Sequence, residues 1–105
     1  EEGSDTVDES KIIISINGTN PQTISATSIY TDVSNPVTIR ENGDVISTSQ
    51  YTVKSTYKDP SGKVITSISG SIENPLASGT YTITYTITYK GKTLKKTATR
   101  QVIVP

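Results

Sequence analysis

Residues 79–89 read Gly79-Thr-Tyr-Thr-Ile-Thr-Tyr-Thr-Ile-Thr-Tyr89, a strict alternation of threonine with tyrosine or isoleucine. Successive side chains of a β-strand point to opposite faces, so this pattern predicts a strand with one apolar face and one threonine face. A second β-rich run occupies residues 93–104, and Lys90-Gly91 supplies the glycine that a two-residue hairpin turn favours. The last quarter of the chain is therefore predicted to be a long antiparallel hairpin with one buried face.

The composition of the whole chain favours strands over helices. The chain contains 14 Ile, 8 Val and 18 Thr, but only 2 Leu and 3 Ala. β-Branched side chains suit a pleated sheet and disfavour a helix. We therefore expect one all-β domain, an immunoglobulin-like antiparallel β-sandwich of seven to eight strands, because turn residues separate many short strand-like runs. The earlier runs cover residues 12–16, 23–30, 37–40, 44–46, 50–57 and 63–72.

The first ten residues differ in character from the rest. They hold five acids, no base and a single valine, so they bury too little apolar surface to offset the entropy of ordering. We predict a disordered acidic tether over residues 1–10 and the sandwich domain over residues 11–105. The domain carries ten bases and five acids, an excess that is better explained by solvated faces than by a nucleic-acid site.

Tyr81 has the setting of a tyrosine corner. It follows Gly79 by two residues and precedes Ile83 by two, as at the start of the strand whose tyrosine hydroxyl bonds to backbone upstream. We expect Tyr81 to make this structural bond. An ordinary core tyrosine is the alternative interpretation.

The final hairpin resembles the end of the bacterial immunoglobulin-like repeats of cell-surface proteins. The resemblance lies in Gly79-Thr-Tyr-Thr-Ile-Thr-Tyr and in Ala98-Thr-Arg-Gln-Val-Ile-Val104. It implies an extracellular, non-catalytic module used for spacing, adhesion or glycan handling. The acidic leader in turn resembles the flexible spacer that follows the lipidated cysteine of bacterial surface lipoproteins. That likeness implies a cell-surface location, with a lipid anchor upstream of residue 1.

Catalytic and metal-binding chemistry has few candidates in this sequence. The chain has no His and no Cys, which removes the usual nucleophile–base pairs and the usual zinc ligands. The acids of the predicted domain fall at scattered turn positions, without the spacing of a glycosidase pair or of a calcium loop. We expect no enzyme, no cofactor and no metal site. No apolar run reaches the length of a membrane span, and no signal peptide is visible.

Basic residues gather in the final hairpin, and its predicted register places two of them inside. A two-residue turn would set Ile87 opposite Leu94 and Ile83 opposite Ala98. The same register places Lys96 beside Tyr85 and Arg100 beside Tyr81. Inward charges on a last strand protect a sheet edge from aggregation, which is one interpretation. The other is a binding surface for an anionic partner, formed by Tyr85, Tyr89, Lys90, Lys92 and Lys96.

Two functional hypotheses follow. The first is a spacer or structural domain of a surface protein, whose partners are the neighbouring domains of the same polypeptide. The second is an adhesin-type module that binds a glycan or a host or surface protein through the basic hairpin or through loops at 17–22 and 55–63. A contiguous exposed patch of tyrosines would favour binding, and burial of all six tyrosines would favour the spacer.

Overall fold

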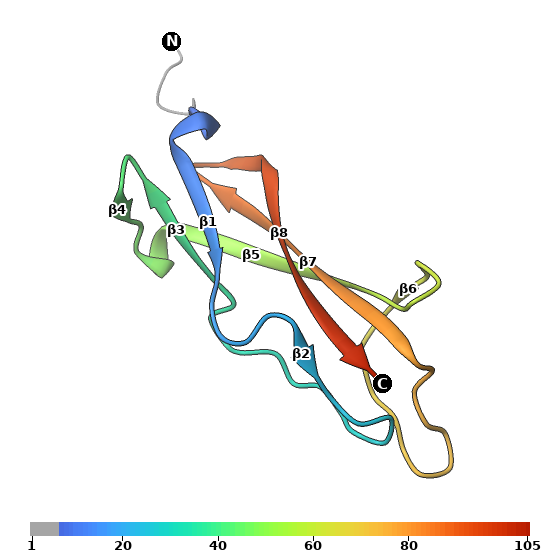
Figure 1. The fold of residues 1–105 in the computed structure, drawn as a ribbon. Coiled ribbons are helices and arrows are strands. Elements are labelled where there is room, and N and C mark those ends of the chain that lie inside the picture. Colours follow the sequence, from blue (N-terminus) through green and yellow to red (C-terminus); the bar gives the residue numbers. More distant parts are fainter. Residues whose placement is uncertain (1–6) are drawn as a thin grey trace.

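The computed structural model describes residues 7–105, and within them the chain is almost entirely strands and loops (Figure 1). Single 3₁₀ turns at Glu9–Lys11 and Thr48–Gln50 are its helical elements. The described part holds no helix long and apolar enough to cross a membrane. Its strands are β1 (Ile12–Ile16), β2 (Gln22–Thr23), β3 (Val37–Glu41), β4 (Asp44–Val45), β5 (Tyr51–Lys58), β6 (Val64–Ile65), β7 (Gly79–Tyr89) and β8 (Lys92–Val104).

The strands form two packed sheets. One has the order β1-β3-β4, and the other has the order β2-β8-β7-β5-β6. The predicted all-β sandwich of seven to eight strands is confirmed. Every pairing is antiparallel except that of β2, which runs parallel to β8.

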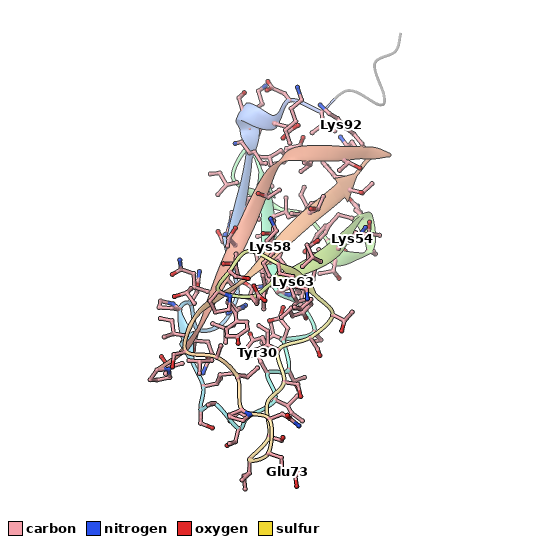
Figure 2. All side chains as sticks on the ribbon, turned by 90° about the vertical axis from the view of Figure 1, so that its right-hand side faces the viewer. Tyr30, Lys54, Lys58, Lys63, Glu73 and Lys92 are labelled. Atoms are coloured by element: carbon pink, nitrogen blue, oxygen red, sulfur yellow. The ribbon has the colours of Figure 1, made fainter. Side chains whose placement is uncertain are left out.

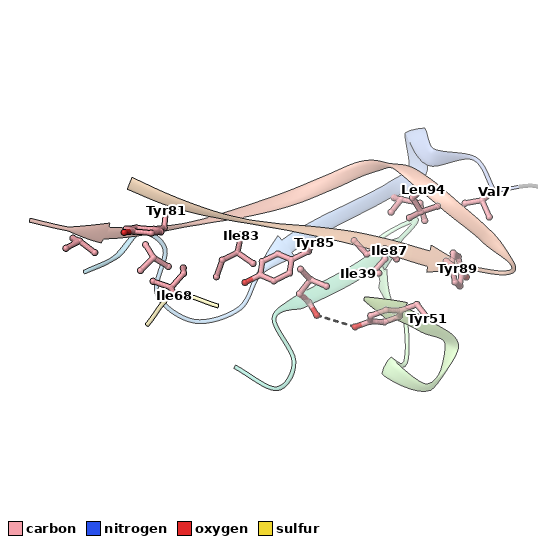
Figure 3. Packing of buried hydrophobic residues seen from close by; sticks show 14 residues of the cluster. Val7, Ile39, Tyr51, Ile68, Tyr81, Ile83, Tyr85, Ile87, Tyr89 and Leu94 are labelled. Carbon is pink, nitrogen blue, oxygen red and sulfur yellow. Dashed lines mark hydrogen bonds between the residues drawn. The ribbon is translucent and has the colours of Figure 1, made fainter. Parts of the chain in front are cut away.

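The alternation in β7 sorts its side chains as the sequence predicts. The tyrosines and isoleucines of this strand are buried in the core (Figure 3). Its threonines from Thr82 onward are only half-buried. The inner face of β7 meets Ile12, Val37 and Ile39 of the small sheet, and the Tyr51 hydroxyl donates to the carbonyl of Val37 at 3.2 Å. The core is therefore centred on the strand that decides the fold.

The turn of the β7–β8 hairpin is as predicted, but its register is not. Tyr89 pairs with Lys92 across Lys90-Gly91, whose φ angles are 52° and 75°. Between the pairs Thr88–Thr93 and Thr86–Thr97, β7 has one residue and β8 has three. The predicted pairings of Ile83 with Ala98, Lys96 with Tyr85 and Arg100 with Tyr81 are therefore wrong, whereas Ile87 lies opposite the bulge that begins at Leu94. Beyond this bulge Ile83 pairs with Arg100, Tyr85 with Ala98 and Tyr81 with Val102.

A carboxylate from the start of the chain explains the bulge. Glu9 accepts the backbone N–H groups of Lys95 and Lys96 at 2.8 and 2.9 Å, which satisfies donors that the bulge removes from the ladder. Two extra residues preserve the alternation of faces, since the side-chain period of a strand is two. Arg100 consequently still points inward, where it is 1% exposed.

The structure differs from the expectation of a tether over residues 7–10. Val7 is buried against the core, Asp8 caps the first 3₁₀ turn, and Glu9 docks on β8. The remainder of the predicted tether, residues 1–6, lies outside the described residues. Residues 7–10 are therefore part of the folded domain, four residues before the predicted boundary at residue 11.

Candidate functional site

A buried polar cluster surrounds Arg100 on the inner face of β8. The Arg100 Nε donates to the Tyr85 hydroxyl at 3.0 Å and lies 3.3 Å from Oδ1 of Asp32. Its two terminal nitrogens donate to the carbonyls of Asn17 and Thr19. One guanidinium thus joins β7 and β8 to the segment between β1 and β2 and to the loop between β2 and β3.

Asp32 is the acceptor at the centre of this cluster. Its Oδ2 accepts the Tyr85 hydroxyl at 2.6 Å, and its Oδ1 accepts the Tyr30 hydroxyl and the Val33 N–H, both at 2.9 Å. Burial and the bond to Asp32 raise the pKa of Tyr30 to about 12, and the same two causes raise the pKa of Tyr85. Both phenols therefore keep their protons at neutral pH and donate hydrogen bonds to the Asp32 carboxylate, which also faces the Arg100 guanidinium.

A hollow of about 420 Å³ opens beside Asp32. One wall is the loop from Asp32 to Pro36, and the other is the inner face of β5 with Tyr51, Val53, Ser55 and Tyr57. Burial, followed by the charge of Asp32, raises the pKa of Tyr57. Within residues 7–105 the Tyr57 hydroxyl has no hydrogen-bond partner. The hollow therefore offers neutral hydroxyl and amide groups to a ligand, while the carboxylate at its inner end is already paired.

The predicted tyrosine–lysine surface is not a continuous exposed patch. Tyr85 is fully buried and Tyr89 is 3% exposed, with its hydroxyl bonded to Glu41 at 2.8 Å. The ammonium of Lys90 lies 5.2 Å from the centre of the Tyr89 ring. Tyr85 and Tyr89 therefore belong to the core, and their hydroxyls are bonded to the carboxylates of Asp32 and Glu41.

The two remaining lysines of that surface are engaged with the N-terminal part of the chain. Lys92 lies 3.5 Å from the Glu9 carboxylate, at the hairpin end of the molecule (Figure 2). Lys96 sits in the bulge and donates from Nζ to the carbonyl of Ile12 at 2.7 Å. Figure 2 also places Lys54, Lys58 and Lys63 around β5 and β6, away from Lys92. The basic side chains are consequently dispersed over several surfaces.

Tyr81 makes the bond expected of a tyrosine corner. Its ring is buried, and its hydroxyl donates to the carbonyl of Ala77, four residues upstream, at 3.2 Å. This contact fixes the chain where it enters β7.

Sequence reasoning missed Asp32, Tyr30 and the hollow beside them. Asp32 lies in a loop whose composition resembles any other turn, and its partner Arg100 is far away along the chain. Among residues 7–105, no three acidic side chains lie close enough together to hold a metal ion. Comparison of the chain with protein-family models, with curated proteins and with solved structures finds no match.

Proposed function

We propose that this chain is a non-catalytic, immunoglobulin-like module of a bacterial surface protein or lipoprotein, which acts outside the cell as a spacer. The observation that carries the proposal is the position of the two ends of the described residues. Glu9 contacts Lys95 and Lys96 at the hairpin end of β8, whereas Val104 pairs with Gly79 at the opposite end (Figure 1). Neighbouring domains joined at these two ends are held apart by the length of the sandwich.

The burial of the tyrosines supports the same function. Tyr51, Tyr81, Tyr85 and Tyr89 are buried, and Tyr30 and Tyr57 are partly buried. Each ring thus contributes to packing, and the six tyrosines form no contiguous exposed patch. The sequence likeness to surface immunoglobulin-like repeats is the basis for the extracellular location.

Small-angle scattering of a tandem protein tests the spacer. Two copies of residues 7–105 joined directly should extend end to end, and the second copy should add roughly 40 Å, the length of a 13-residue strand. A tandem with a long Gly/Ser linker is the control, because it should show no fixed increment. Two copies folded side by side in the directly joined tandem would refute a spacer. Protease treatment of intact cells that carry the full-length protein tests its surface location.

The hollow beside Asp32 supports a second candidate, a module that binds a small neutral sugar. Its lining favours hydrogen bonding over charge, so binding should be independent of salt. Tyr57→Ala should abolish such binding, whereas Lys92→Glu with Lys96→Glu should leave it unchanged. An anionic glycan with the opposite pattern would instead point to the hairpin surface. Shifts of backbone amide signals on addition of oligosaccharides would distinguish the two sites.

A further inference from the structure

The N-terminal part of the chain contacts β8 near both of its ends and at points between them. Within this part β1 pairs with β3 in the other sheet, and β2 forms a ladder with the edge of β8 opposite β7. Figure 1 shows the arrows of β1, β2 and β8 pointing the same way. The contacts advance in the same direction along both segments. From the hairpin end onward they join Glu9 to Lys95 and Lys96, Ile12 to Lys96, Asn17 and Thr19 to Arg100, Asn20 to Thr99 and Gln101, Gln22 to Val102, and Thr23 and Ile24 to Ile103.

Side chains supply the pairing where no strand is present. Asn20 donates from Nδ2 to the carbonyl of Thr99 at 3.1 Å and accepts the N–H of Gln101 on Oδ1 at 2.9 Å. A neighbouring strand would offer this same donor and acceptor, so one amide side chain extends the two-residue ladder of β2. At the bulge the Glu9 carboxylate supplies acceptors alone, for the N–H groups of Lys95 and Lys96.

The direction of this pairing decides how it responds to tension. Residue 9 lies at one end of β8 and residue 104 at the other, so a pull on the two chain ends slides residues 9–24 along β8. The bonds cross between parallel segments and are loaded together. A pull that lifts residue 27 away from the C-terminus would instead load the same contacts one after another.

We infer that residues 9–24 and β8 form a mechanical clamp, and that the module bears tension between the domains on its two sides. The inference rests on the proposed spacer function and adds to it a resistance to force along the axis of the array. Load entering near Glu9 passes to β8, the strand that leads directly out of the module at Val104.

Single-molecule force spectroscopy tests the clamp in two geometries. Handles at the two chain ends apply the sliding load, and a handle at Thr27→Cys with one at the C-terminus applies the peeling load. The chain has no cysteine of its own, so each attachment is unique. At one fixed load, we expect the unfolding rate in the sliding geometry to be lower than in the peeling geometry by a factor of roughly ten or more. Equal unfolding rates in the two geometries would overturn the inference.

Asn20→Ala tests the clamp residue by residue. It removes two of the bonds to β8, and unfolding under the sliding load should become roughly tenfold faster. Asn74→Ala is the matched control, because Asn74 is exposed in the loop before β7 and its side chain makes no hydrogen bond within residues 7–105. Tyr51→Phe, which weakens the core on β5, corrects for a general loss of stability.

The result for Asn20→Ala is compared with Tyr51→Phe at equal loss of equilibrium stability. A larger acceleration for Asn20→Ala under the sliding load supports the clamp, and an equal acceleration overturns it. The scattering experiment on the tandem is independent of this result. An extended tandem without a sliding resistance would leave the spacer intact and remove the clamp alone.

Discussion

Nε of Arg100 lies 3.3 Å from Oδ1 of Asp32, and this ion pair ties the loop after Tyr30 to the inner face of β8. The side chains are 1% and 10% exposed, so water screens the pair weakly. Its remaining hydrogen-bonding capacity is met by Tyr30, Tyr85 and backbone carbonyls, which is the condition under which a buried pair is tolerated. The cluster therefore holds long loops that the thin apolar core does not reach.

Removal of one partner should be costly, because it leaves the other charge buried without compensation. We expect Asp32→Ala to lower the free energy of unfolding by about 3–5 kcal/mol in urea denaturation. Arg100→Met combined with Asp32→Asn removes both charges and should recover part of the loss. A loss below about 1 kcal/mol for Asp32→Ala, typical of an exposed pair, would contradict a structural role for the cluster.

The Tyr81 hydroxyl should contribute through its bond to Ala77. We expect Tyr81→Phe to lower the free energy of unfolding by roughly 0.5–1.5 kcal/mol, because the change removes one buried hydrogen bond and leaves the ring in place. Tyr57→Phe is the control, since that hydroxyl has no partner within residues 7–105. An unchanged denaturation midpoint for Tyr81→Phe would argue against the corner.

The hairpins could be predicted because their signals are local. Alternation fixes the buried face of β7, and both tight turns contain a glycine at positive φ, 86° at Gly43 and 75° at Gly91. The alternation of side chains along β8 also predicts that Arg100 points inward. The sequence does not identify Asp32 as its partner, because nothing near Asp32 distinguishes that acid from one in a solvated turn.

Two predicted strands are mainly loop in the structure, because most of their residues have no neighbouring strand to pair with. The runs at 23–30 and 63–72 have strand-like composition, yet they keep only β2, β6 and one bridge between Ile29 and Ser69. Amino-acid composition indicates how well a residue suits a β-sheet, but a strand also needs a neighbouring strand with which to hydrogen-bond. The bulge was hidden for the same reason, since it depends on Glu9 from the other end of the chain.

The contact of Glu9 with β8 predicts a loss of stability in acid. The N–H groups of Lys95 and Lys96, followed by Lys92, hold the pKa of Glu9 below its ordinary value of 4.5. The folded state thus binds this proton less readily than the unfolded state, so the contribution is present above about pH 4.5 and disappears as the pH falls through the lower folded value. Glu9→Gln should flatten the acid limb of a plot of stability against pH. An unchanged acid limb in that variant would refute the contact.

The tyrosines of the central cluster predict the opposite behaviour in alkali. Burial and the bond to Asp32 raise the pKa of Tyr30 to about 12 and raise that of Tyr85, whereas an unfolded tyrosine ionises near 10. The folded state therefore keeps protons that the unfolded state loses, and this stabilisation is complete below pH 10 and declines as the pH rises toward 12. Phenolate absorbance and far-UV circular dichroism, followed together, should show part of the tyrosine ionisation coinciding with the loss of sheet signal. Tyr30→Phe should make stability less dependent on pH in this range. Complete ionisation near pH 10 with the sheet signal intact would show that these hydroxyls are not held by Asp32.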